Sequence, residues 1–334
     1  MKNRVFPSFF LSLLLAGSPI NAGAASSADV VFYGATAAGV MGAIQAHRSG
    51  LKTVVISPSE RIGGMTTGGL GATDFGSKTS VSGLAKEFYQ RIYETYLEPS
   101  RWVHETRDEF VVRHPDTVSE DLKMQWFFEP KVALEVLEKM LAETGVEVWK
   151  GVDLAEGGVL KSGNIITGLR LSDGRELQGK MFVDTSYEGD LMAAAGVPYV
   201  TGREANSEFH EELNGIRVND RKKTGSISPF IIPGDRSSGL LPLVEGKRPG
   251  ADGEGDHRVQ AYNYRMCLTD AEVNRRPVEK PANYDPKLYE LAARWILAHP
   301  KATLGKSLFK LTPMPNRKTD SNNQGPFSTD FVGM

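Results

Sequence analysis

The strongest constraint on the fold is a strand–turn–helix–strand pattern near the start of the chain. Residues 29–33 form a short apolar run of the kind that makes a buried parallel strand. Gly34 breaks this run, apolar residues then recur at helical spacing over 40–47, and residues 53–56 form a second apolar run. The pattern spans roughly 30 residues, the size of a βαβ unit with a right-handed crossover. We therefore expect an α/β fold.

The turn after the first strand is rich in small residues. Gly34-Ala35-Thr36-Ala37-Ala38-Gly39 is similar to the dinucleotide fingerprint G-x-G-x-x-G, with Thr36 in place of the middle glycine. Gly34 permits a tight turn, Gly39 lets the helix pack close to the strand, and the helix N-terminus offers N–H groups to phosphates. The hydroxyl of Thr36 is able to donate to a phosphate. Ser57 stands where an acid for the ribose is expected, with Glu60 three residues on.

Hydrophobic periodicity predicts the remaining elements. We expect helices over 84–96, from Pro130 to about Gly145, over 191–195 and over 286–298. Two further parallel strands are expected at 146–149 and 181–184, with a β-meander between them that is divided by turns such as Asp173-Gly174. We also expect an aromatic strand at 126–128, an irregular stretch over 98–120 and a loop-like C-terminus.

A second group of motifs carries a family resemblance. The run Glu60-Arg61-Ile62-Gly63-Gly64-Met65 resembles the R-x-G-G element that follows the βαβ unit in FAD enzymes of the glutathione-reductase-like superfamily. The longer stretch 61–71, with Thr73-Asp74, resembles bacterial FAD-dependent oxidoreductases whose members are labelled heterodisulfide-reductase-subunit-A-like or "xanthan lyase". Further blocks of the same family are similar to residues 128–133, 182–193, 262–265 and 315–320.

The resemblance implies an FAD/NAD(P)-binding Rossmann-like parallel sheet with an inserted β-meander, plus a partial α+β substrate region. FAD is then the cofactor, with its adenine ribose near Ser57, its pyrophosphate at Gly34–Gly39 and its isoalloxazine near Gly64–Gly69. The predicted FAD-binding residues are Gly34, Ala35, Thr36, Ala37, Ala38, Gly39, Ser57, Arg61, Gly63, Gly64, Met65, Thr66, Gly69, Asp184 and Asp190. The family's closing FAD segment is not found, so we expect a C-terminally truncated member.

Catalytic residues are not identified by the sequence. Tyr187, Glu188 and Asp190 follow a strand, where α/β ligand sites lie, and Asp190 either caps the next helix or contacts FAD. Arg203 and Glu204 either face the substrate or form a surface ion pair. The distal polar residues belong either to a loop or to a substrate pocket; they are Arg265, Asn316, Lys318, Asp320, Asn322 and Asn323.

Cysteine and histidine usage limits other chemistries. Cys267 is the only cysteine, so a four-cysteine iron–sulfur site is excluded, and we expect this thiol to be buried. The six histidines are scattered without metal-ligand spacing, and we expect no metal. The net charge of -2 gives no reason to expect a nucleic-acid partner.

The N-terminus has the three parts of a secretory signal peptide. Lys2 and Arg4 precede an apolar run over 9–16, and Ala22-Gly23-Ala24 fits a cleavage site. The run is too short to span a bilayer, so no transmembrane anchor is expected after cleavage. We expect a periplasmic or secreted protein with a signal peptide over 1–25, an FAD-binding domain over 26–200 (segments 28–80 and 125–200) and an incomplete substrate or cap region over 201–334.

Together these observations predict a secreted FAD-dependent oxidoreductase. The expected reaction is hydride transfer from an unidentified small-molecule substrate, which the export signal and family label suggest is related to carbohydrate, to N5 of the flavin. Two alternatives stay open, a non-catalytic FAD-binding fragment and a polysaccharide-active protein.

Overall fold

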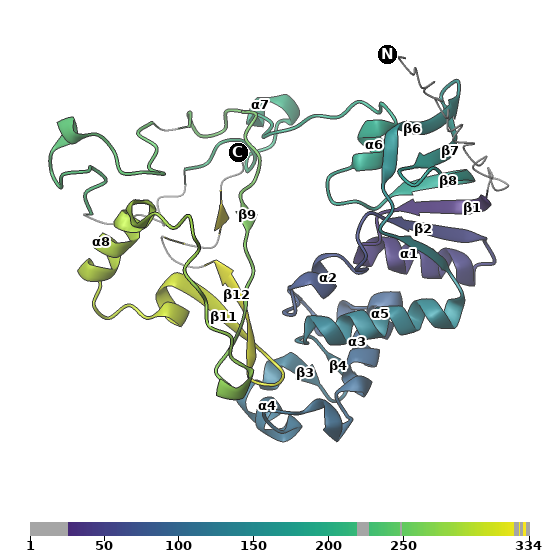
Figure 1. Cartoon of the computed structure of the whole chain (residues 1–334), viewed down its shortest axis with the longest axis horizontal. Helices are drawn as coiled ribbons and strands as arrows, with labels where there is room; N and C mark the ends of the chain where they lie inside the picture. The colour runs from purple at the N-terminus through teal and green to yellow at the C-terminus, as the bar shows by residue number, and fades with distance from the viewer. Residues whose placement is uncertain (1–25, 219–226, 248, 324–326, 328–329, 332–334) are drawn as a thin grey trace, which may run out of the picture.

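The computed structural model describes residues 26–218, 227–247, 249–323, 327 and 330–331. The predicted signal peptide over 1–25 lies outside the described residues. Figure 1 shows a sheet covered by helices on one side of the view and a second part with a smaller sheet on the other. In the described part of the chain, no helix is long and apolar enough to cross a membrane.

The main sheet has six strands in the order β5-β2-β1-β8-β7-β6. The strands are β1 (Ser26–Tyr33), β2 (Thr53–Ser57), β5 (Glu147–Lys150), β6 (Leu154–Ser162), β7 (Ile165–Leu171) and β8 (Glu176–Asp184). β5, β2, β1 and β8 run parallel, whereas β6, β7 and β8 form an antiparallel meander. The predicted α/β fold, with a mostly parallel sheet and an inserted meander, is confirmed.

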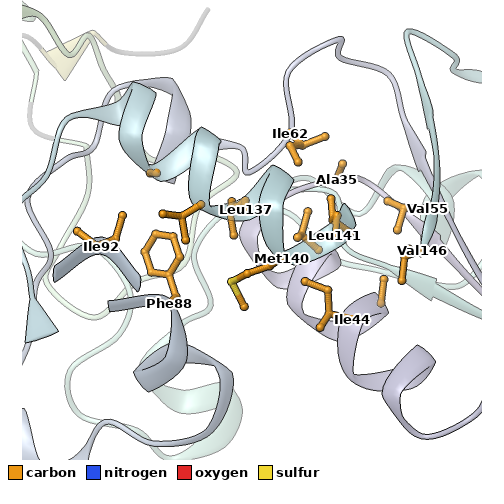
Figure 2. Packing of buried hydrophobic residues seen from close by; sticks show 14 of the residues in the cluster. Ala35, Ile44, Val55, Ile62, Phe88, Ile92, Leu137, Met140, Leu141 and Val146 are labelled. Carbon is orange, nitrogen blue, oxygen red and sulfur yellow. The ribbon is translucent and has the colours of Figure 1, made fainter. Parts of the chain in front are cut away.

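Strand β1 is buried on both faces, as a central parallel strand must be. Phe32 packs toward the helices, whereas Val31 and Tyr33 pack on the opposite face. The helices on the first face are α1 (Ala37–Arg48), α3 (Gly83–Thr95) and α5 (Pro130–Thr144). Figure 2 shows their shared core, with Ile44, Phe88, Leu137 and Met140 pointing toward one another. This core fixes the N-terminus of α1 at the end of β1.

The stretch between α3 and α5 is more regular than predicted. It contains α4 (Arg107–Arg113), which begins with a capping box between Thr106 and Glu109, and the short strands β3 (Val118–Ser119) and β4 (Met124–Gln125). The aromatic strand expected at 126–128 is wrong, because β4 ends before Trp126 and Phe127 makes only an isolated bridge with Ala72.

The second part of the chain carries a three-stranded antiparallel sheet in the order β10-β12-β11. The expectation of a loop-like C-terminus is therefore wrong, since β11 and β12 pair over six residues each. The elements here are α7 (Asn206–Phe209), β9 (Tyr262–Asn263), β10 (Cys267–Thr269), α8 (Glu290–Ala298), β11 (Phe309–Met314), β12 (Lys318–Asn323) and β13 (Asp330–Phe331). The helix expected over 286–298 is present as α8 with a preceding 3₁₀ turn.

Two further short helices, α2 (Met65–Gly68) and α6 (Asp190–Ala194), follow β2 and β8. The remaining turns are the 3₁₀ segments Lys78–Ser80, Pro99–Arg101, Pro115–Thr117, Arg236–Ser238, Glu272–Asn274 and Pro286–Tyr289 and the π-helical Leu304–Leu308. Cys267 is exposed, because β10 is an edge strand, so the expectation of a buried thiol is wrong.

Candidate functional site

A cavity of about 440 Å³ lies at the carboxyl ends of β1, β2 and β8. In an open α/β sheet this edge is where ligands bind. The lining residues come from the turns that follow the three strands and from the glycine-rich segment near α2. They are Gly34, Ala35, Thr36, Ser57, Pro58, Ser59, Arg61, Gly64, Gly68, Ser186, Tyr187, Glu188 and Asp190.

Gly34 and Gly39 are required by close packing at this edge. Gly34 has a φ of +103°, and a Cβ there would lie 2.6 Å from the backbone nitrogen of Ser186. A Cβ on Gly39 would collide with the carbonyl oxygen of Gly34 and with the Thr185 hydroxyl. Both glycines therefore let the turn after β1, the start of α1 and the turn after β8 meet without a gap.

Thr36 acts inside the turn as the N-cap of α1. Its hydroxyl donates to the carbonyl of Thr185 at 2.8 Å and accepts the N–H of Gly39 at 3.3 Å. Because the hydroxyl's proton is used within the turn, donation to a phosphate would require this bond to break, and it stays a prediction. The N–H groups of Ala37 and Ala38 belong to the first turn of α1, where a helix supplies no acceptor of its own.

At the end of β2, where an acidic residue is expected to bind the ribose, the chain has Ser57, which carries a hydroxyl. Ser57 is buried and its hydroxyl donates to the carbonyl of Ser59 at 2.6 Å. Glu60 does not line the cavity, because its carboxylate lies against Gly151 in the turn after β5. Arg61 does line it, and its Nε donates to the carbonyl of Thr67 at 2.8 Å. Arg61 is thus a positive group fixed at the wall of the cavity.

The turn after β8 is held by Asp184 and Ser186. Asp184 Oδ1 accepts from the backbone and hydroxyl of Ser186, and Oδ2 accepts from the N–H of Met192 at 2.8 Å. The Ser186 hydroxyl accepts from Gly189 and Asp190. These two side chains therefore cap α6. Of the two roles considered for Asp190, capping is excluded, and its side chain lies at the cavity instead.

Tyr187 closes one side of the cavity over the glycine-rich segment. Its hydroxyl accepts the N–H of Met65 at 2.6 Å, and a Cβ on Gly64 would collide with the same hydroxyl. Glu188 accepts a hydrogen bond from Tyr262 in β9 at 3.1 Å. These contacts join the turn after β8 to the glycine-rich segment and to the second part of the chain, and no sequence pattern indicates them.

The structure brings only part of the predicted cofactor set to the cavity wall. Gly34, Ala35, Thr36, Ser57, Arg61, Gly64 and Asp190 line it. The members of the set that do not line it are Ala37, Ala38, Gly39, Gly63, Met65, Thr66, Gly69 and Asp184. Pro58, Ser59 and Ser186 line the cavity but are outside the predicted set, whereas Gly68 lies in the range Gly64–Gly69 expected near the isoalloxazine. The turns directly after β2 and β8 are the signals that would have found the first three.

Several of the distal polar residues gather around a buried carboxylate. Glu129 is only 2% exposed and receives hydrogen bonds from Tyr96, from the amide of Asn316 at 2.9 Å and from Lys318. Asn316 also accepts the N–H of Val103 at 2.6 Å. Two of the family-like blocks, 128–133 and 315–320, therefore meet in space. Here Asn316 and Lys318 bind protein groups.

Two further candidate residues, Arg265 and Arg203, form ion pairs with aspartates. Arg265 donates to Asp320 at 2.8 Å, close to Gly69, where an added Cβ would lie 3.8 Å from the Cβ of Arg265. Arg203 donates from Nε and from one terminal nitrogen to the two carboxylate oxygens of Asp256, so its partner is not Glu204. Within the described residues, no group of three or more His, Cys, Asp and Glu side chains is placed to hold a metal ion.

Residues 29–334 match the profile of a family described as FAD dependent oxidoreductase. No curated protein matches the sequence. Among solved structures, the chain is similar to L-proline dehydrogenase from P. horikoshii, with 14% identity, a TM-score of 0.34, and coverage of 55% of this chain and 59% of that one. L-Amino acid deaminase from Proteus vulgaris has 16% identity and a TM-score of 0.36, with coverage of 53% of this chain and 52% of that one. Glycine oxidase from Bacillus cereus has 12% identity and a TM-score of 0.32, with coverage of 50% of this chain and 57% of that one. The chain thus covers less than two thirds of each of these structures.

Proposed function

Because the chain belongs to the FAD-dependent oxidoreductase family, we propose that the cavity at the ends of β1, β2 and β8 holds the adenosine and pyrophosphate of FAD. The observation that carries this proposal is the cavity itself, which is lined by Gly34–Thr36 and lies beside the N-terminus of α1. A helix N-terminus next to a glycine turn is a site where backbone N–H groups bind phosphate.

The residues present fit the pyrophosphate and the ribose of FAD in different ways. Since the Thr36 hydroxyl is already bonded, the pyrophosphate would be held by backbone N–H groups at the start of α1 and by the guanidinium of Arg61. The buried Ser57 leaves no carboxylate at the end of β2. Asp190 and Glu188 are the carboxylates at the cavity, and we propose that they accept hydrogen bonds from ribose or ribityl hydroxyls.

Bound FAD supplies a two-electron acceptor for hydride from a substrate carbon. The chain's own residues bind and orient it. Gly63–Gly69 would lie along the ring portion beyond the pyrophosphate, because Gly64 and Gly68 form the cavity wall on that side. Tyr187 has to release the Met65 N–H for any ligand group to reach that N–H, since its hydroxyl now occupies the position.

We further propose that residues 201–334 form the substrate region and that the substrate is an uncharged, polyhydroxylated molecule. The support is the charge balance beside Gly69, where Asp320 neutralises Arg265, so that this pair carries no net charge with which to select an anion. Exposed Tyr264 adds an aromatic surface next to Arg265 in the chain. Neutral hydroxyl groups are suited to such paired donors and acceptors.

Export is proposed from the N-terminal sequence alone. Lys2 and Arg4, the apolar run over 9–16 and Ala22-Gly23-Ala24 follow the order of a signal peptide. N-terminal sequencing of the protein from its native host would show a start near residue 25 if the segment is removed. A mature protein that begins at Met1 would contradict the proposal.

The proposed function is tested by the visible spectrum of the purified protein. We expect flavin absorbance, retained through gel filtration, and bleaching of the oxidised flavin when a polyol or sugar that is a substrate is added without oxygen. A colourless protein that takes up no added FAD would refute FAD binding. An FAD-loaded protein that is bleached only by charged substrates would refute the substrate class but leave the cofactor assignment intact.

A further inference from the structure

Asp320 is a buried carboxylate with an unused oxygen. It is 1% exposed and lies in the middle of β12, paired in register with Cys267 on β10 and Thr312 on β11. Oδ2 receives the hydrogen bond from Arg265, whereas Oδ1 is buried and has no hydrogen-bond partner among the described residues. Most buried polar atoms in proteins are hydrogen-bonded, so an unpaired carboxylate oxygen calls for a ligand or a proton.

The location of Asp320 connects it with the proposed FAD site. Its partner Arg265 lies next to Gly69, and Met314 of the same sheet packs against Gly71. The side chain of Arg265 is one fifth exposed and that of Asp320 is 2% exposed, so Arg265 is the more accessible member of the pair. The glycine-rich segment that lines the cavity at Gly68 therefore leads directly to the Arg265–Asp320 pair.

The charges around Asp320 favour proton uptake. Burial raises the pKa of its carboxyl above the usual range, and the negative charge of Asp74 raises it further, against the opposing effects of Arg265 and Lys310. The neighbouring thiol of Cys267, opposite Asp320 on β10, is a further titratable group on this face. A carboxyl with a raised pKa and a free oxygen is a better proton acceptor than an ordinary carboxylate.

We propose that Asp320 is the proton-accepting residue of the oxidation reaction and that Arg265 is its positioning residue. For a substrate with a hydroxyl on the carbon that is oxidised, the O–H bond breaks and its proton passes to Oδ1 of Asp320. The C–H hydrogen leaves with its electron pair as hydride to FAD, and a C=O double bond remains. This inference rests on the proposed function, since it requires FAD beside Gly69.

The proposal predicts a linkage between proton uptake at Asp320 and the redox state of the bound cofactor. Negative charge gained on reduction raises the pKa of a nearby carboxyl, so Asp320 takes up a proton between its pKa in the oxidised protein and its higher pKa in the reduced protein. In that pH window the midpoint potential of the FAD-loaded protein falls more steeply as pH rises.

The test is potentiometric titration with dithionite of the FAD-loaded wild type, Asp320→Asn and a matched control. Asp270→Asn removes the same charge from another Arg–Asp pair near this sheet, between Asp270 and Arg317 at 2.9 Å, where the Asp270 side chain is 72% exposed. We expect Asp320→Asn to lose the additional pH dependence and Asp270→Asn to keep it. Equal pH dependence in the wild type and Asp320→Asn would overturn the inference while the proposed function stands. A wild type that binds no FAD would overturn both.

A second measurement does not depend on FAD or on the folding of Asp320→Asn. Carbon-13 NMR of the apo protein labelled at aspartate Cγ should show one aspartate that titrates above the ordinary range. Replacing Arg265 by Gln removes the opposing positive charge and should move that titration to still higher pH. The absence of such a resonance, or a titration that does not respond to Arg265→Gln, would overturn the inference.

Discussion

Gly34 shows how much of the cofactor site depends on a single missing side chain. Its φ of +103° strains any residue with a Cβ, and the turn after β8 fills the space that the Cβ would need. The strain and the crowding are separate costs. Gly50, at the end of α1, has a φ of +87°, and a Cβ added there would meet nothing within 4 Å, so it carries the strain without the crowding.

We expect Gly34→Ala to lower the free energy of unfolding by about 1–3 kcal/mol more than Gly50→Ala, the usual cost of overpacking. It should also weaken FAD binding at least tenfold, because the displaced turn moves the backbone N–H groups of α1, whereas Gly50→Ala should bind FAD as the wild type does. Urea unfolding and titration of the apo protein with FAD measure the two effects. Equal losses in both variants would show that crowding at the turn is unimportant.

Which site residues can be predicted depends on whether their partners are close in sequence. Gly34 and Gly39 are predictable because a strand, a turn and a helix follow one another within a short segment. The partners of Thr36 and Met65 are not, since their hydrogen bonds go to Thr185 and Tyr187, more than 100 residues away. A fingerprint shows which residues the backbone needs, but it does not show which side chains are already bonded.

The N-termini of α3 and α4 offer a comparison at the scale of the element. The Thr106 hydroxyl accepts the N–H of Glu109 and donates to its carboxylate, and the Thr106 N–H donates to the same carboxylate in a capping box. By contrast, the side chain of Ser82 at the start of α3 makes no capping hydrogen bond. The T-x-x-E pattern is present in the sequence, but the surrounding residues are polar and the helix is only seven residues long, so hydrophobic periodicity does not predict α4.

Replacement of the two caps by alanine should therefore have different effects. Thr106→Ala removes two hydrogen bonds and should lower the free energy of unfolding by about 1 kcal/mol. Ser82→Ala removes no capping bond and should change it by less than about 0.5 kcal/mol. Thermal and urea unfolding of both variants measure the difference, and an equal loss would contradict the assigned capping box.

The β11–β12 hairpin is joined to the first part of the chain through Glu129, which precedes α5. Lys318 hydrogen-bonds this buried carboxylate and is mostly buried, whereas Lys131 lies 3.6 Å from the same carboxylate and is 61% exposed. Long-range pairing of this kind explains why the sequence pattern predicts a loop here, because the polar residues of the hairpin look like a turn until their buried partner is known.

We expect Lys318→Met to lower the free energy of unfolding by about 3–5 kcal/mol, because it leaves the Glu129 charge buried with one partner fewer. Lys131→Met removes an exposed contact with the same carboxylate and should cost less than about 1 kcal/mol. The double variant Lys318→Met with Glu129→Gln should recover part of the loss. A small effect of Lys318→Met would show that the hairpin is not held by this pair.

At the scale of the whole molecule, the first part of the chain is more predictable than the second. Its strands β1 and β2 are apolar runs that are mostly buried, so the order strand, helix, strand follows from residues 29–57. The second part has short strands with half-buried patterns, and none of its described residues belongs to the three buried hydrophobic clusters. Without hydrophobic periodicity, local sequence does not specify which segments pair.

Three helices of the first part are linked by one charge cluster on their outer surface. Glu87 of α3 lies between Arg48 of α1 and Arg91 of its own helix, and Arg91 also pairs with Glu143 of α5. Hydrogen bonds from Arg48, and then from Arg91, hold the pKa of Glu87 below its usual value. The stability that this cluster gives to the packing of α1, α3 and α5 therefore depends on pH.

Because the pKa of Glu87 is lower in the folded than in the unfolded protein, its contribution to stability is present above the unfolded value of 4.5 and is lost as pH falls through the folded pKa. We expect the free energy of unfolding to decrease as pH falls through this acid range. In Glu87→Gln this decrease should be smaller by about 1 kcal/mol or less, because the ion pair between Glu87 and Arg48 is partly exposed. Glu94→Gln, on the same helix and with no ion pair found among the described residues, is the control and should leave the pH dependence unchanged. Urea unfolding between pH 7 and the acid limit of folding measures the three proteins. Equal pH dependence in Glu87→Gln and the wild type would show that the three helices pack without help from the cluster.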